Sequence, residues 1–179
     1  MKEFWDFDES DNYIKIVYNN NNYKVLKRYP DYSTAVQILN QIRTIILKMC
    51  QYLEVNKHSY SEIEQQRINC FLLIHPYNYL LSEMQIGTQF DGLNKPKNLY
   101  TSNNKLGEDK YLRAGYRDVF LRLRNNNGQF RSNKNIIDLV IHEITHTMCN
   151  HVTWRDDNHG EDFTESEKLL KNVVLKFNV

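Results

Sequence analysis

The feature that most restricts how this chain can fold is a cluster of histidines near its C-terminal end. The chain of 179 residues holds only six histidines, and four of them, His142, His146, His151 and His159, fall within the segment HEITHTMCNHVTWRDDNHG. Successive residues of an α-helix advance by about 100°, so His142 and His146 would project from one side of a helix, one turn apart. Two imidazoles at that spacing can bind one metal ion, provided that the fold brings a third ligand back to them.

A helix is predicted around the first two of these histidines. Asn135 is a suitable N-cap and Asp138 lies favourably in the first turn of a helix over 135–149. Its apolar side is formed by Ile137, Val140, Ile141, Ile144 and Met148. Glu143 directly follows His142 and completes the pattern H-E-x-x-H, in which two histidines bind zinc and the glutamate acts as general base. The bare pattern also occurs by chance, but the preceding strand pattern, the apolar opposite side and the later histidine favour a zinc site here.

Two residues compete for the position of third zinc ligand. His151 lies nine residues after His142, about 180° around a continuing helix, so it would face away. His151 also misses the H-E-x-x-H-x-x-G-x-x-H spacing of metzincins. His159 follows a segment, 151–158, that can turn the chain back, and it is expected in the first turn of the last helix. The sequence therefore favours His159, with His151 as the alternative.

The rest of the chain predicts a mixture of helices and strands. Two alternating segments, 13–18 and 23–28, flank a run of four asparagines, Asn19 to Asn22, and predict a β-hairpin. The next predicted elements are a helix from Ser33 to about Leu53, a helix opened by Ser59 or Ser61 and limited by Pro76, a long loop at 85–112 and a strand at 119–124. A last helix should begin near Asn158 with Glu161 in a capping box and bury Phe163, Leu170, Val173, Val174 and Phe177.

Composition limits the class of protein. A chain of this length fits a single domain, 1–179, whose hydrophobic core can be stable without disulfide bonds or a structural metal ion. Its formal net charge of +1 does not indicate a nucleic-acid binder at the level of the whole chain. We find no signal-peptide pattern and no apolar run that could span a membrane. Three widely spaced cysteines suit reduced thiols, so we expect an intracellular protein, cytoplasmic or nuclear and not secreted. Its abundant asparagine, lysine, tyrosine and isoleucine are typical of an AT-rich genome, such as a viral one.

The motif residues resemble those of a known family. H-E-x-x-H followed by a loop and H-G-x-x-F is similar to the SprT-like (Spartan-type) zinc proteases and to the related WLM proteases, whose third histidine comes sooner. The matching residues are His142, Glu143, His146, His159, Gly160 and Phe163, and the resemblance covers about 116–177. It implies an α+β fold, a compact zincin-like (minigluzincin) domain with helices packed on a small antiparallel sheet. The chain would then consist of an N-terminal hairpin (1–30), a helical part with the long loop (31–112) and a zincin core carrying the metal site (113–179).

The same resemblance implies a zinc-dependent metallopeptidase that hydrolyses peptide bonds by a zinc-activated water. The implied ligands of Zn²⁺ are His142, His146 and His159, and Glu143 is the implied base. His151 and Arg155 are secondary candidates, for stabilising the oxyanion. Candidate partners that would orient the ligand imidazoles are Asp156, Asp157 and Asp162. The expected partner is a protein or peptide substrate, with no membrane, and family members often cleave proteins crosslinked to DNA.

Two other functions are compatible with the sequence. One is a non-catalytic, zinc-stabilised binding domain, although a structural zinc site needs no base such as Glu143 and usually closes its fourth position. The other is a DNA-associated adaptor that uses the basic residues in and around the strand at 119–124, where an extended substrate peptide is also expected to pair. These residues are Arg113, Arg117, Arg122, Arg124 and Arg131. We favour an ordinary solvated strand face as their interpretation. The sequence carries no signature of an oligomeric state.

Overall fold

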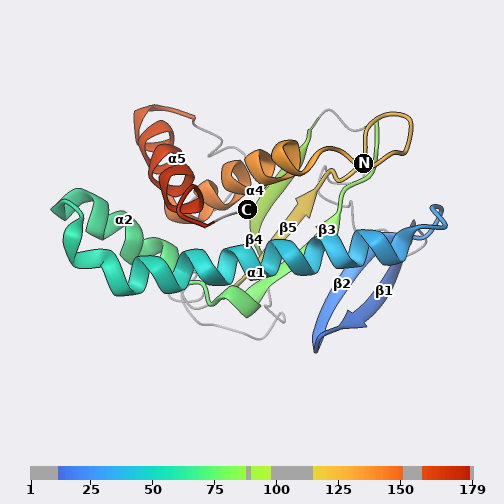
Figure 1. The fold of residues 1–179 in the computed structure, drawn as a ribbon, viewed down its shortest axis with the longest axis horizontal. Coiled ribbons are helices and arrows are strands. Elements are labelled where there is room, and N and C mark those ends of the chain that lie inside the picture. Colours follow the sequence, from blue (N-terminus) through green and yellow to red (C-terminus); the bar gives the residue numbers. More distant parts are fainter. Residues whose placement is uncertain (1–11, 88–89, 98–114, 151–158, 178–179) are drawn as a thin grey trace, which may run out of the picture.

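The computed structural model describes residues 12–87, 90–97, 115–150 and 159–177, which form an α+β fold (Figure 1). Four α-helices of this described part pack on a five-stranded mixed sheet. The strands are β1 (Tyr13–Tyr18), β2 (Asn21–Leu26), β3 (Tyr79–Glu83), β4 (Gly92–Lys97) and β5 (Tyr116–Leu121). The α-helices are α1 (Tyr32–Asn56), α2 (Glu62–Leu72), α4 (Asn133–Met148) and α5 (Glu161–Val174), with short 3₁₀ helices η2 (Lys57–Ser59) and η3 (Pro76–Asn78).

The sheet has the strand order β1-β2-β3-β5-β4 and combines two kinds of pairing. β1 pairs with β2, and β4 with β5, in antiparallel register, whereas β3 is parallel to both of its neighbours, β2 and β5. Parallel neighbours require a crossover connection, and α1 and α2 provide it between β2 and β3. The expected antiparallel sheet is therefore wrong in the centre of the sheet and correct at its two ends.

The hairpin of β1 and β2 confirms the prediction made from the asparagine run. Asn19 and Asn20 have positive φ angles of 48° and 63°, as the two central residues of a type I′ turn require. Asparagine adopts this left-handed conformation more readily than most residues with a side chain. Because the turn uses only two of the four asparagines, β2 begins at Asn21 instead of residue 23.

The first two helices lie in the segments where the sequence predicts helices. α1 begins at Tyr32, after Asp31 as N-cap, so Ser33 is inside the helix instead of capping it. α2 has a complete capping box: the Ser61 hydroxyl accepts a hydrogen bond from the Glu64 backbone N–H, and the Glu64 carboxylate accepts one from the Ser61 N–H. Of the two serines considered, Ser61 is therefore the cap.

The caps of the last two helices differ from the prediction. Ser132, not Asn135, caps α4, and its hydroxyl accepts a hydrogen bond from the Asn135 backbone N–H. Gly160 is the N-cap of α5 and has no side chain with which to form the expected capping box. The predicted start at Asn158 lies outside the described residues. His159 therefore immediately precedes the helix cap and does not lie in the first turn.

Two strands were missed by the sequence prediction. β3, YLLSE, begins with a short apolar run, which periodicity alone does not distinguish from part of a buried helix. β4 lies inside 85–112, predicted to be loop, and its sequence GLNKPK contains glycine, asparagine and proline, which are depleted in strands. An edge strand tolerates these residues because its outer side makes no ladder hydrogen bonds. The predicted strand at 119–124 is β5, which begins and ends three residues earlier.

The larger hydrophobic core fills the space between one face of the sheet and the helices. α1 runs across the molecule (Figure 1) and buries a stripe that includes Leu39, Ile46, Met49 and Leu53. The core residues of α4 are Ile136, Leu139, Val140, Ile141, Ile144 and Met148, and those of α5 include Leu169, Leu170, Val173 and Val174. Ile137 and Phe177, predicted to be buried, pack only partly buried against this core. A smaller cluster contains Tyr13, Leu26, Met84 and Phe120.

Arg124 is buried, although we expected it on a solvated strand face. Only 1% of its side chain is exposed, and its Nε donates to Glu83 Oε1 at 2.7 Å. One of its terminal nitrogens pairs with Asp31 at 2.8 Å. The guanidinium lies over the rings of Tyr29 and Phe130, 4.1 Å from each centroid. Burial raises the pKa of the Glu83 carboxyl, and the hydrogen bond from Arg124 opposes that shift.

Two further arginines of this region are also engaged inside the protein. Arg117 is buried, and its Nε donates to Asn94 Oδ1 at 2.6 Å. Arg122 pairs with Asp91 at 3.2 Å. Arg113 lies outside the described residues. For Arg117 and Arg124, both the solvated face and the exposed phosphate-binding patch are therefore wrong interpretations.

The three cysteines are free thiols, as expected. Burial raises the pKa of Cys50 to about 12 and also raises the pKa of Cys149, so both remain protonated at neutral pH. Cys50 lies in the core, while Cys70 and Cys149 are half-buried. Among the described residues, no helix combines the length and the apolar character needed to cross a membrane.

We predict that Arg124→Ala lowers the free energy of unfolding by about 3–5 kcal/mol, because the substitution leaves the Glu83 carboxylate buried without its charged partner. Urea denaturation followed by circular dichroism measures this change. Lys134→Ala serves as the control, since its exposed ion pair with Asp138 should contribute only about 0.3–0.5 kcal/mol. Equal effects of the two substitutions would contradict the proposed importance of the buried pair.

Candidate metal centre

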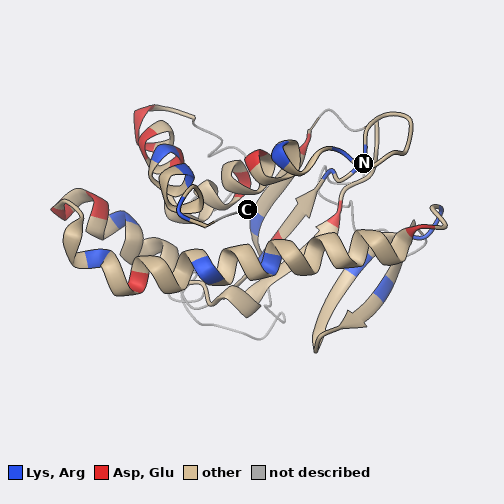
Figure 2. Ribbon diagram, in the orientation of Figure 1, with Lys and Arg blue, Asp and Glu red and all other residues tan. Residues whose placement is uncertain are grey.

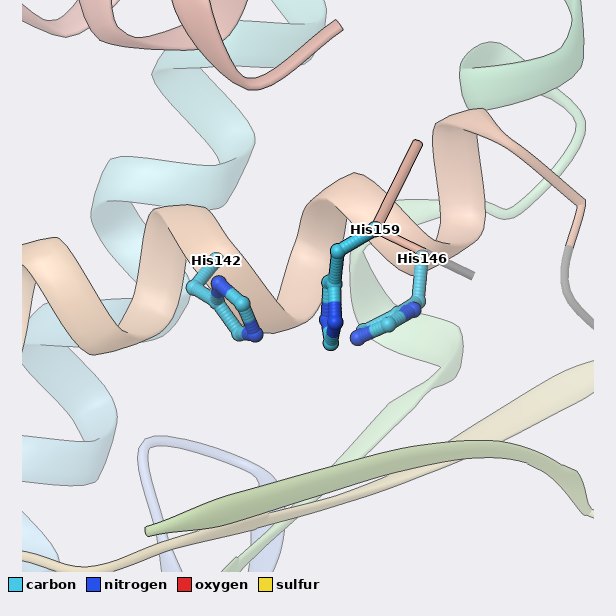
Figure 3. Close-up of side chains that lie close together, drawn as sticks. All are labelled: His142, His146 and His159. Carbon is cyan, nitrogen blue, oxygen red and sulfur yellow. The ribbon is translucent and has the colours of Figure 1, made fainter. Parts of the chain in front are cut away.

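Three histidines from two parts of the chain converge beside α4. His142 and His146 project from one side of this helix, and His159 reaches the same place from the segment before α5 (Figure 3). Their candidate ligand nitrogens all lie within 4.8 Å of one another. The ring centroids are 5.5 Å apart for His142 and His146, 4.8 Å for His142 and His159, and 5.3 Å for His146 and His159. This convergence is the arrangement that the histidine spacing predicted.

The three imidazoles fit one metal ion with little movement. Metal–nitrogen bonds of about 2.0–2.1 Å in a tetrahedral site hold the nitrogens roughly 3.4 Å apart, so the rings need to close by only a small distance. His146 is buried, with 8% of the residue exposed, whereas His142 is half-buried and His159 is exposed. The site is therefore fixed in the protein on one side and open to solvent on the other. Imidazole donors suit several divalent metals, including Zn²⁺.

Phe163 forms an apolar support for all three imidazoles. The centroid of its ring lies 5.0 Å from that of His142, 4.9 Å from that of His146 and 4.5 Å from that of His159. Phe163 is buried at the start of α5, where we expected it to anchor the helix. By contacting every ring, it holds His159 beside the two histidines of α4.

Glu167 orients the first histidine. Its Oε2 lies 3.0 Å from His142 Nδ1, so a proton on Nδ1 is donated to the carboxylate and Nε2 is left free to bind a metal. Glu167 Oε1 accepts a hydrogen bond from Lys171 at 3.2 Å, which fixes the carboxylate in turn. The sequence analysis missed Glu167. The available signal was its position four residues after Phe163, one turn further along the same side of α5.

The carboxylates that we proposed for this orienting role do not fill it in the described structure. Asp162 pairs with Arg67 of α2 at 3.0 Å, as does Glu165. Asp156 and Asp157 lie outside the described residues, as do His151 and Arg155. The structure therefore brings His159 to the pair on α4 and leaves the alternative ligand, His151, undescribed.

The side chain of Glu143 extends from α4 toward β4, the last strand of the sheet in the described part of the chain. Only 4% of the residue is exposed, and its side chain lies close to Gly92 of β4: a Cβ atom added to Gly92 would stand 2.6 Å from Glu143 Oε1. Glu143 directly follows the candidate ligand His142 in the sequence, about 100° further around α4. The candidate site thus offers three imidazole nitrogens, and the buried Glu143 is the residue that follows its first histidine.

Comparisons with protein-family models, curated proteins and solved structures find no match to this chain. The resemblance to SprT-like and WLM proteases consequently depends on the motif residues alone.

We predict that Glu167→Ala weakens metal binding by about 10–100-fold, because His142 loses the partner that fixes its ring and its tautomer. Competition with a chromophoric chelator measures the affinity. Glu165→Ala is the matched control, since Glu165 lies on the same helix and its carboxylate bonds to Arg67 instead of to a histidine. Unchanged affinity in Glu167→Ala would show that the contact with His142 does not contribute.

Proposed function

We propose that this protein is a zinc-dependent metallopeptidase of the SprT-like or WLM type that hydrolyses peptide bonds. The observation that carries the proposal is the convergence of His142, His146 and His159, with ligand atoms within 4.8 Å of one another, next to the buried Glu143. Three protein ligands are typical of catalytic zinc sites, which keep one position for water or substrate. The Zn²⁺ ion would polarise the scissile carbonyl and make water a better nucleophile near neutral pH.

Glu143 would act as the general base and then as the general acid. Its carboxylate would accept a proton from the attacking water and return that proton to the leaving amine. The side chain of Glu143 has little freedom to move, because it is buried and lies close to Gly92 of β4. His151 and Arg155, which lie outside the described residues, stay secondary candidates for stabilising the oxyanion.

The substrate is proposed to pair with β4 instead of the strand at 119–124. β5, which contains 119–121, is paired on both sides, with β3 and with β4, so it offers no free edge. β4 is the last strand of the sheet in the described part of the chain and lies against Glu143. An extended peptide can add to such an edge through main-chain hydrogen bonds. This arrangement would hold the scissile bond beside the base.

The proposed substrate is a protein or peptide in an intracellular compartment, and the free cysteines are consistent with reducing conditions. Proteins associated with or crosslinked to DNA stay candidate substrates through the family resemblance. Positive and negative residues are interspersed along the described helices (Figure 2). The burial of Arg117 and Arg124 removes two of the five arginines on which a phosphate-binding patch was based.

The alternative is a non-catalytic, zinc-stabilised binding domain. A purely structural site gives no reason to hold a carboxylate beside the ligands, and it usually fills all four positions with protein groups. Among the described residues only the three histidines form a candidate metal cluster. The Glu143 that follows His142 in the sequence therefore supports the peptidase over the binding domain, and a DNA-associated adaptor would bind DNA without requiring zinc.

We predict that Glu143→Gln reduces peptide hydrolysis by about 10²–10⁴-fold, because the amide cannot accept the proton from water. The zinc-loaded protein should be assayed with a denatured, fluorescently labelled protein substrate, with and without DNA. The variant should still bind one zinc per chain, since Glu143 is not a proposed ligand, and metal analysis checks this point. Hydrolysis by Glu143→Gln at the wild-type rate would exclude the proposed base, and stoichiometric zinc without any hydrolysis by the wild type would favour the binding domain.

A further inference from the structure

The segment Gly92-Leu93-Asn94 of β4 is the place where the sheet meets the metal-binding helix. Alternate residues of a strand face the same side, so Gly92 and Asn94 face one way and Leu93 the other. Leu93 accordingly packs with the smaller hydrophobic cluster. Gly92 and Asn94 both contact α4 within the turn that separates the two candidate ligands.

Gly92 contacts Glu143 so closely that no side chain fits between them. A Cβ atom at position 92 would lie 2.6 Å from Glu143 Oε1 and 2.8 Å from both Cδ and Cγ. The φ angle of Gly92 is not in the left-handed region, so backbone conformation does not demand glycine here. Glycine is the residue that lets the Glu143 side chain keep this position, because a larger residue at position 92 would make that side chain move.

Asn94 holds the same strand to α4 by hydrogen bonds. Its Nδ2 donates to the Glu143 backbone carbonyl at 2.6 Å and to Thr147 Oγ1 at 2.9 Å. Its Oδ1 accepts from Arg117 Nε at 2.6 Å, which fixes the orientation of the amide. Asn94, Arg117 and Thr147 are all buried, so the geometry of this network is protected from competing water.

We propose that Gly92 and Asn94 are positioning residues for Glu143. Asn94 fixes the separation between β4 and the turn of α4 that carries Glu143, and Gly92 leaves room in that gap for the carboxylate. The base is thereby held at the strand that would pair with substrate. This inference rests on the proposed peptidase function for its catalytic consequence, but the contact itself can be tested without any catalysis.

A double-mutant cycle tests the contact directly. Gly92→Ala should lower the midpoint of thermal unfolding by about 5 °C, because the new methyl group overlaps the Glu143 side chain. All three contacting atoms of Glu143 lie beyond its Cβ and are absent from Glu143→Ala. In that background, Gly92→Ala should therefore lower the midpoint by less than half as much. An equal decrease in both backgrounds would overturn the inference, and the double variant remains informative even if Gly92→Ala alone does not fold.

Activity measurements test the positioning role. Gly92→Ala and Asn94→Ala should each reduce kcat at least tenfold, while zinc stoichiometry stays at one and KM changes less than threefold. Asn40→Ala is the matched control, because its amide oxygen accepts a hydrogen bond from Tyr23 away from the metal centre, and it should leave kcat unchanged. Full kcat in Asn94→Ala would overturn the positioning role. Absence of hydrolysis by the wild type would instead refute the peptidase proposal, and the thermal cycle would still decide on the contact.

Discussion

The packing of α4 determines the geometry of the candidate metal centre. This helix is buried along most of its length, because the sheet packs against one of its sides and α2 and α5 pack against other sides. A helix held on several sides cannot rotate without creating cavities in the core. The two histidines that it presents therefore have fixed directions, and the third must be brought to them. The apolar residues of α4 thus help to fix the positions of the two histidines, although none of them is a candidate ligand.

The third histidine depends on α5, whose position is fixed by different forces. Its apolar stripe enters the main core, while Arg67 of α2 joins Asp162 and Glu165 at its exposed start. Exposed ion pairs contribute little to stability, so burial of the stripe supplies most of the force that positions α5. Phe163 and Glu167 transmit that position to the imidazoles, one by ring packing and the other by a hydrogen bond.

The sequence predicts local features of this protein better than its long-range contacts. The turn in the asparagine run, the start of a helix at Ser61 (one of the two serines considered) and the helical spacing of the histidine pair each depend on residues close together in the chain, and the structure has all three. The capping box, in contrast, was expected at the start of α5 and occurs at the start of α2. The convergence of His159 was also predicted, because only a short stretch of sequence separates it from the helix that carries His142 and His146. Edge strand β4 was missed, since its stability comes from pairing with β5 and contact with α4 and not from its own residues. The roles of Glu167 and Asn94 depend on partners 23 to 53 residues away, which no local pattern specifies.

The composition of β4 divides that strand into two unlike halves. Its second half contains Pro96, which lacks the backbone donor that a neighbouring strand needs. The first half contains no proline, and it is the half that lies against Glu143. An extended chain that joined this edge would consequently have its uninterrupted backbone pairing confined to a few residues next to the Glu143 carboxylate.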